Sequence, residues 1–126
     1  MRAFSALLLL TLSASLLAEE GGGVIRYVDE DSDRTPIHTV VPTYPEKARR
    51  HRVEGEVQVS FDIDRQGRPY RIAVRNSSHR VFEKPAKLAV RASSWQPLGP
   101  NEQKSGIKTC RLFRFELERI PVSELN

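Results

Sequence analysis

The sequence is poor in the residues that enzymes and metal proteins use for chemistry. Its 126 residues include one cysteine and three histidines. The single Cys110 excludes an internal disulfide, and no cysteine or carboxylate falls at metal-ligand spacing around His38, His51 or His79. The chain also lacks a nucleophile-elbow sequence and a glycine-rich phosphate loop. We therefore expect a protein that is not an enzyme and that holds no metal or cofactor.

Long apolar runs are also scarce, and the one that is present lies at the N-terminus. Arg2 precedes an apolar stretch at residues 3–17, a pattern that predicts a cleaved export signal over residues 1–18, with cleavage near Ser15 or Ala18. An uncleaved membrane anchor is the alternative, but the stretch to Ala18 would span only ~24 Å of a ~30 Å hydrocarbon core. Export argues against a nucleic-acid partner.

The charge balance is mildly basic. Twenty Lys and Arg residues against 16 Asp and Glu residues give a net charge of +4. The densest basic cluster lies at residues 47–52, where we expect one or two helical turns. Such a cluster can meet anionic envelope material or an acidic partner. A solvated helix face is the more common meaning of a charge run, and we favour that interpretation.

Composition divides the rest of the chain into a leader, a domain and a tail. Residues 19–40 open with glycines and continue with acidic and polar residues, which predicts a flexible leader, although residues 24–28 could add a short strand. Residues 41–118 carry the periodic patterns of a folded domain. Pro121 disfavours a continuing strand in the tail at residues 119–126.

Two alternating segments predict a β-hairpin. Apolar and polar residues alternate over residues 56–63, turn chemistry follows at residues 64–67, and a second alternating segment begins after Pro69. The expected register places three apolar pairs on one face and an ion pair on the other. These pairs are Ile63 with Tyr70, Phe61 with Ile72, Val59 with Val74, and Asp62 with Arg71.

A helix and a last strand complete the predicted domain. Because proline is tolerated only in the first turn of a helix, Pro85 requires the helix to begin near Phe82 or Glu83. Residues 108–117 alternate again and predict a strand. The fold class that follows is α+β, a two-layer sandwich in which helices cover a three-stranded antiparallel sheet. The expected core consists of Val57, Val59, Phe61, Ile63, Tyr70, Ile72, Val74, Phe82, Ala86, Ala89, Val90, Ser93, Phe113, Phe115 and Leu117.

The order and spacing of several short motifs resemble one known family. The motifs are Pro42 to Arg49 with the pattern Pro-x-Tyr-Pro-x-x-Ala-Arg, Gly55, Asp64 to Gly67, Ser77-Ser78, Phe82 with Ala86, Ala89 and Val90, Trp95-Gln96-Pro97, and Phe113 to Leu117. Over residues 40–118 this pattern resembles the TonB C-terminal domain family, whose periplasmic members couple inner-membrane energy to outer-membrane receptors. Ser93 departs from the family, which often has a bulky residue there.

The resemblance implies a periplasmic protein-binding module. In this family the TonB-box segment of an outer-membrane receptor pairs beside the last strand of the domain, by main-chain hydrogen bonds to an exposed sheet edge. Other proteins of the TonB system are alternative partners, and exposed edges would also allow a homodimer by strand exchange. We expect four residues of the last strand at or beside the docking edge: Lys108, Cys110, Leu112 and Arg114.

Two functions of different class are compatible with these features. The first is a transport component that engages receptors or TonB-system proteins, in energy-coupled transport or its regulation. The second is an envelope interaction or structural protein that binds peptidoglycan or another periplasmic protein and has no part in transport. Resemblance of fold does not separate the two, because one fold serves many functions.

Overall fold

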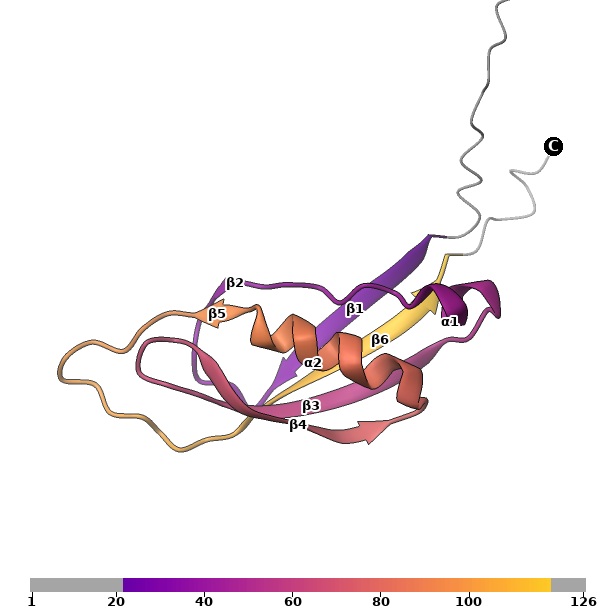
Figure 1. Ribbon diagram of the computed structural model, residues 1–126. Coiled ribbons are helices and arrows are strands. Elements are labelled where there is room, and N and C mark those ends of the chain that lie inside the picture. Colours follow the sequence, from indigo (N-terminus) through magenta and orange to yellow (C-terminus); the bar gives the residue numbers. More distant parts are fainter. Residues whose placement is uncertain (1–21, 119–126) are drawn as a thin grey trace, which may run out of the picture.

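The alternating segment at residues 55–63 forms an inner strand of an antiparallel sheet, as its period-2 pattern predicts. The computed structural model describes residues 22–118. In chain order the elements are β1 (Gly23–Glu30), β2 (Pro36–His38), α1 (Glu46–Arg50), β3 (Gly55–Ile63), β4 (Pro69–Ser77), the 3-10 helix η1 (Arg80–Phe82), α2 (Glu83–Arg91), β5 (Ser94–Trp95) and β6 (Thr109–Leu117). Helix α2 lies over the four-stranded sheet, and β2 and β5 form a separate short ladder (Figure 1).

The strands of the large sheet do not follow their order in the sequence. Their spatial order is β1-β6-β3-β4, and each neighbouring pair is antiparallel. The last strand therefore lies between the first strand and the hairpin. Gly23 at the start of β1 pairs with Leu117 at the end of β6, so these two ends lie side by side (Figure 1). The expected α+β architecture is confirmed, with four strands in the sheet in place of three.

The fourth strand comes from the segment that the sequence analysis expects to be a flexible leader. Residues 23–30 pair with β6 along their whole length, ending with Glu30 opposite Cys110. The leader assignment is wrong for these residues, and the alternative of a short strand is correct. Its sequence signal is weak because no residue of β1 is buried. The predicted signal at residues 1–18 and the tail at 119–126 lie outside the described residues.

The β3–β4 hairpin has the expected partners in its middle but not near its turn. The observed pairs include Val59 with Val74, as expected, and Asp62 with Tyr70 and Ile63 with Pro69, which differ from the expected register. The cause is a β-bulge, since the ladder shifts between Ser60 and Asp62, and Arg71 on the other strand has a left-handed φ of 52°. The expected ion pair survives, with Arg71 Nη1 3.9 Å from the Asp62 carboxylate.

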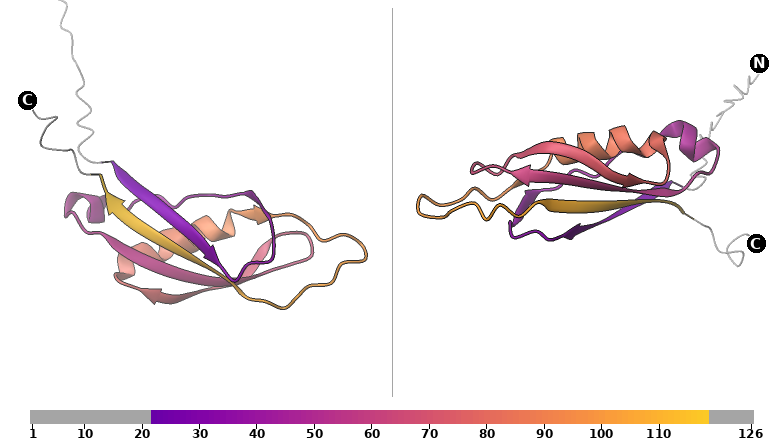
Figure 2. Two further views of the ribbon diagram at one scale, coloured as in Figure 1. Left: turned by 180° about the vertical axis from the view of Figure 1, so that it is seen from behind. Right: turned by 90° about the horizontal axis from the view of Figure 1, so that it is seen from below.

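The helices begin where the prolines and the apolar spacing predict. Helix α2 starts at Glu83, after one turn of 3-10 helix, so Pro85 falls in the first turn, where its missing N–H costs no helical hydrogen bond. Helix α1 starts after Pro45, whose carbonyl accepts the Arg49 N–H at 2.9 Å. Both helices lie on the same side of the sheet (Figure 2, right). Within residues 22–118, neither helix is long and apolar enough for a membrane span.

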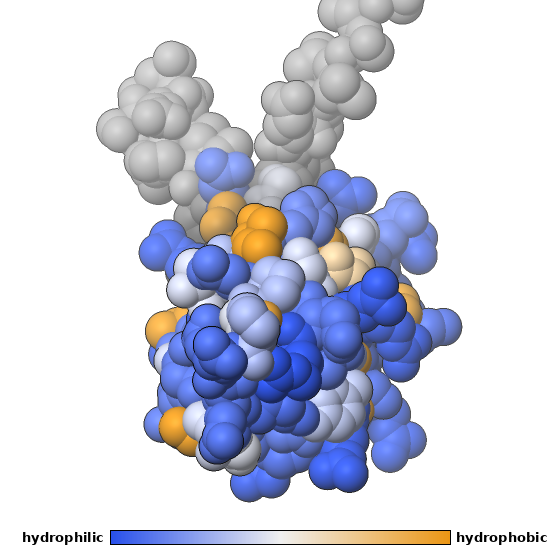
Figure 3. All heavy atoms as spheres, turned by 90° about the vertical axis from the view of Figure 1, so that its left-hand side faces the viewer, coloured by the Kyte–Doolittle hydropathy of each residue, from blue (hydrophilic) through white to orange (hydrophobic). Residues whose placement is uncertain are grey.

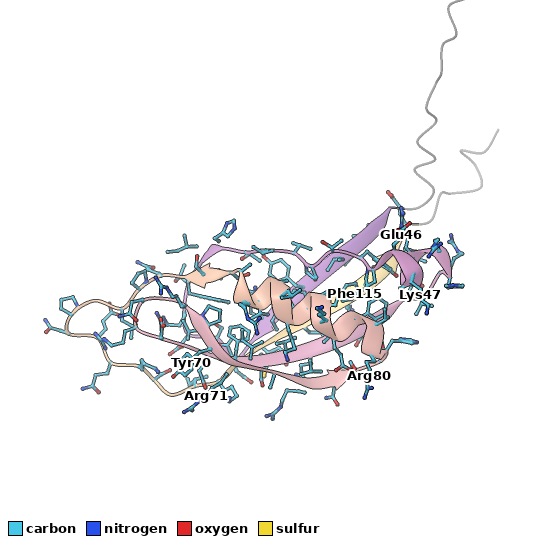
Figure 4. The ribbon with its side chains drawn as sticks, in the orientation of Figure 1. Glu46, Lys47, Tyr70, Arg71, Arg80 and Phe115 are labelled. Atoms are coloured by element: carbon cyan, nitrogen blue, oxygen red, sulfur yellow. The ribbon has the colours of Figure 1, made fainter. Side chains whose placement is uncertain are left out.

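The core lies between α2 and the sheet and is built around aromatic rings. Phe82 and Phe115 stack with their centroids 4.3 Å apart, and Tyr44 meets both edge-on at 5.8 and 5.6 Å. Phe115 projects from β6 into this layer (Figure 4). Tyr70 is only partly buried because β4 is an edge strand. The buried hydrophobic residues are Ala48, Val57, Val59, Phe61, Ile63, Phe82, Ala86, Ala89, Val90, Trp95, Phe113, Phe115 and Leu117.

The turn between β3 and β4 is held by contacts from distant parts of the chain. The Trp95 N–H donates to the Gly67 carbonyl at 2.8 Å. The Arg65 guanidinium donates to the carbonyls of Gly99 and Glu102 at 3.1 and 2.8 Å. Figure 3 shows the end of the molecule that carries the β3–β4 turn and the loop between β5 and β6. The surface at this end is mostly hydrophilic. Tertiary contacts therefore support the turn, in addition to its own turn chemistry.

We predict that Gly67→Ala destabilises the protein by about 2 kcal/mol or more in chemical denaturation. Gly67 has a φ of +88°, and a Cβ at this position would overlap the carbonyl of Trp95. Gly106→Ala is the matched control, because Gly106 has a φ of +77° but open space where its Cβ would lie. Its cost should be about 1 kcal/mol from backbone strain alone. Equal losses for the two variants would contradict the role assigned to the Gly67–Trp95 contact.

Tyr44 connects the extended segment before α1 to the core. Its hydroxyl donates a hydrogen bond to the Val53 carbonyl. Burial raises the pKa of Tyr44 above its ordinary value of 10.0, and the negative charge of Glu54 adds to this shift, while Arg52 opposes it. The folded protein therefore favours the protonated phenol, which keeps the hydrogen bond.

For Tyr44→Phe we predict a loss of about 1 kcal/mol at neutral pH, because the ring packing remains and one hydrogen bond is lost. The pH dependence should also change. A raised pKa in the folded state contributes stability that is complete below pH 10.0 and is lost as the pH rises through the folded pKa. Denaturation from pH 8 to about pH 11 should therefore show a steeper alkaline decline for the wild type than for Tyr44→Phe. Parallel declines would contradict this assignment, and Tyr27→Phe, at an exposed tyrosine, serves as the control.

Candidate partner-binding strand

The outer row of side chains on β6 contains the residues that the sequence analysis predicts for partner binding. Cys110, Leu112 and Arg114 alternate with buried residues and lie on the sheet face opposite the core. Lys108 immediately precedes the strand, which begins at Thr109. The structure therefore brings the four predicted residues together in one row, and their contact with a partner remains a prediction.

The backbone edge of β6 is not open, contrary to the expectation from the sequence. β3 pairs with one side of the strand and β1 pairs with the other. The β6 peptide groups that face away from β3 therefore have their partners in β1, from Glu30 opposite Cys110 to Gly23 opposite Leu117. The unpaired edges of this sheet belong to β1 and β4.

The outer face of the sheet around β6 combines ion pairs with a small apolar strip. Arg114 Nε lies 3.3 Å from Glu56 on β3, and both side chains are more than half exposed, at 55% and 54%. The Lys108 ammonium lies 3.5 Å from the Asp62 carboxylate. Between these pairs, Leu112 lies opposite Val28 of β1, which is 52% exposed. The exposed Arg114–Glu56 pair contributes little to stability, so its two charges are available to a partner.

The inward row of β6 contains a residue that the sequence analysis missed. Arg111 stands in a row of apolar residues, and its side chain is fully buried. A charged residue at a position where alternation requires an apolar one is the signal that could have revealed it. The guanidinium lies between the rings of Tyr27 and Trp95, at 4.9 and 5.1 Å from their centroids. Its Nε and Nη2 both donate to the Asp29 carboxylate, Nη2 to Oδ2 at 2.8 Å.

The strand that covers β6 is less buried than the two inner strands of the sheet, β3 and β6. None of its residues is buried, and Val24, Tyr27 and Val28 are 39%, 44% and 52% exposed. β3 and β6 each bury at least half of their residues. Burial supplies about 25 cal/mol per Å² of apolar surface, so β1 gains less from packing than its neighbours do. Its ladder with β6 and the Asp29–Arg111 ion pair are its main attachments.

Other candidate sites have less support. Within residues 22–118 no group of three or more His, Cys, Asp and Glu residues could hold a metal ion. Cys110 is a free, partly buried thiol. The basic residues 47–52 form an exposed cluster, apart from buried Ala48, at the opposite end of the molecule from Tyr70 and Arg71 (Figure 4). Exposure of this cluster agrees with the solvated helix face that we favour.

Comparison with known proteins shows one consistent relationship. The family model for the Gram-negative bacterial TonB protein C-terminal matches residues 40–117. Protein TonB of Escherichia coli (strain K12) is 34% identical over 75 residues, which are 59% of this chain and 30% of that protein. Protein TonB of Pseudomonas aeruginosa is 29% identical over 90 residues, 71% of this chain and 26% of that protein. The chain thus spans less than a third of the length of both curated relatives.

A solved structure shows the same relationship in three dimensions. The solution NMR structure of the Pseudomonas aeruginosa TonB CTD matches with a TM-score of 0.59 and 29% identity. The match covers 73% of this chain and 94% of that one. The structural match therefore covers a larger share of this chain than the family model, which matches residues 40–117. The family match itself begins after β1 and β2. From the sequence match and the shared fold together, the chain belongs to the family of Gram-negative bacterial TonB protein C-terminal domains.

Proposed function

We propose that this protein is a periplasmic TonB-like binding module. It engages outer-membrane receptors or other TonB-system proteins by strand addition beside β6, and it serves energy-coupled transport or its regulation. Family membership supports the class of partner. The structure supports the mode of binding, because β6 is a long strand whose inward row is anchored in the core while its outer row is accessible. The proposed activity is binding and not catalysis.

The observation that carries the proposal is the pairing of β6 with a weakly buried strand of the same chain. Since β1 already occupies the side of β6 away from β3, a partner strand docks there by taking the place of β1. Such an exchange replaces each main-chain hydrogen bond with an equivalent one, so the hydrogen-bond ladder itself changes little. Family membership does not depend on β1, because the matched region starts at residue 40.

The tether between β1 and the rest of the domain sets the affinity that a partner needs. A strand joined by a short linker competes at an effective concentration on the order of mM. An incoming strand therefore succeeds only if it pairs with β6 better than β1 does, or if β1 is loosened first. This competition gives the protein a way to bind selectively, since a strand that merely equals β1 is excluded.

A reversible lock on β1 tests this proposal. Glu30 lies directly opposite the native Cys110. Opposed residues in an antiparallel ladder have Cα atoms about 4.5–5.5 Å apart, within the ~4.4–6.8 Å that a disulfide spans. We predict that Glu30→Cys, once oxidised, loses binding of a receptor TonB-box peptide by at least about tenfold in fluorescence anisotropy. Reduction should restore the binding.

The control for this lock is Glu30→Ser, which keeps Cys110 but cannot form the bond. It should bind as the wild type does under both redox conditions. Wild-type affinity of the oxidised variant, with the disulfide verified by mass spectrometry, would rule out exchange at β6. Peptidoglycan binding through the exposed basic residues 47–52 is the alternative function, and it would not respond to the redox state of residue 30.

The outer row of β6 gives a second test of the same proposal. Arg114→Glu should weaken the TonB-box peptide several-fold at low salt, because a partner strand on β6 passes directly beside this side chain and meets its charge. Leu112→Pro is less informative, since proline in a central strand removes a ladder hydrogen bond and threatens the fold. Arg91→Glu on the exposed end of α2 is the control with the same charge change. Equal effects of the two substitutions would show that net charge, and not the β6 row, determines binding.

A further inference from the structure

Arg111 has an unusual position for a charged residue. Its side chain is fully buried on the inward row of β6, and it shares this row with Phe113 and Phe115. A buried charge is tolerated only where a partner of opposite sign and additional hydrogen bonds compensate its lost hydration. Two of its nitrogens donate to the Asp29 carboxylate, and its guanidinium carbon lies 4.9 and 5.1 Å from the ring centroids of Tyr27 and Trp95.

The groups that compensate Arg111 come mainly from the strand that a partner would displace. Asp29 pairs directly with Arg111 in the β1–β6 ladder, and Tyr27 is two residues away on the same face of β1. Only the Trp95 ring comes from the remainder of the domain. When β1 leaves β6, Arg111 therefore loses its carboxylate and one of its two rings at the same time.

β1 is also an incomplete partner for this site. Arg111 Nη1 and Trp95 Nε1 are buried and have no hydrogen-bond acceptor among the described residues. Both nitrogens donate hydrogen bonds and cannot accept them. The side chain of Asp29 is 17% exposed, so it closes the site at its rim. An incoming strand with further acceptor atoms here would satisfy donors that β1 leaves unpaired.

The geometry points to Arg111 as the residue that selects the partner strand, by binding a carboxylate at the register position of Asp29. This inference rests on the proposed strand exchange at β6 and adds the chemistry of the partner. The partner is an extended acidic segment whose inward row repeats the pattern of β1, an apolar residue, then an aromatic or apolar one, then Asp or Glu. In β1 these positions are Ile25, Tyr27 and Asp29.

A carboxylate fits this site better than other side chains do. The Nε and Nη2 edge of an arginine matches the two oxygens of a carboxylate, and such paired, charge-assisted hydrogen bonds are the strongest kind. An amide has one acceptor oxygen and would turn its own donors toward the guanidinium. An apolar side chain would leave the charge without compensation in a buried place. The site therefore selects a strand with a carboxylate at this position in two ways. It binds the carboxylate, and it disfavours strands without one because they leave the buried charge of Arg111 uncompensated.

The test uses the full chain with β1 weakened and labelled peptides as the incoming strand. In the protein, Asp29→Lys places a second cation beside Arg111 and should release β1 from β6. Circular dichroism verifies that this variant is folded. Asp29→Asn in the protein is a milder second variant. The probe is a peptide with the sequence of residues 22–31. We expect the peptide that carries Asp29→Asn to bind the Asp29→Lys protein at least about tenfold more weakly than the peptide of native sequence does. The Glu30→Gln peptide loses the same charge from the outer face and should remain within about twofold of the native sequence.

A matching change in the protein completes the cycle. Arg111→Leu, added to the Asp29→Lys chain, should abolish the preference for the acidic peptide over its Asn form, while Arg114→Gln should preserve that preference. A purely structural role for Arg111 would weaken both peptides equally and leave the preference intact. This outcome, or equal binding of the Asp and Asn peptides to the Asp29→Lys chain, overturns the assignment of Arg111 and leaves exchange at β6 standing. If neither these peptides nor the TonB-box peptide binds to the variants in which β1 is released, the proposed function itself is overturned.

Discussion

The constraint on which the whole structure depends is that β6 must have a strand on each side. Its inward row supplies Phe113 and Phe115 to the core, so the strand lies in the interior of the sheet and not at an exposed edge. A buried strand with unpaired peptide groups is costly, because each unmet N–H or C=O loses its hydration without compensation. β3 satisfies one side and β1 satisfies the other. The first strand of the sheet therefore completes the fold beside the strand at which we propose that a partner docks.

The attachment of β1 reflects a balance between one strong contact and many weak ones. Loss of one partner from a buried ion pair typically costs about 3–5 kcal/mol, which favours retention of Asp29 beside Arg111. Against this, no residue of β1 is buried, and large apolar side chains such as Val28 remain half exposed. A strand of this kind lies toward the low end of local stability within a domain. Under the proposed exchange, β1 covers β6 in the free protein and is replaced only by a partner strand that pairs with β6 better than β1 does.

Sequence patterns predicted the elements whose signals are local. The start of α2 followed from Pro85, and the central pairing of Val59 with Val74 followed from alternation. The register near the turn could not be predicted, because the bulge depends on the left-handed backbone of Arg71. Arginine rarely adopts this conformation, so the sequence carries no signal for it. Trp95 was predicted as part of a motif, but not as a core residue that contacts Arg111, since its contacts come from distant segments.

By itself, the sequence determined the two-layer class, the hairpin, the position of α2 and the family, because these depend on residues that are close together in the chain or spaced in a fixed order. It also determined that Cys110, Leu112 and Arg114 share one face of the last strand, since alternation alone requires it. Only the tertiary structure decided what lies beside that strand. Asp29 and Arg111 are 82 residues apart, and their contact depends on the folding of residues 23–30 back onto β6, which no local pattern specifies.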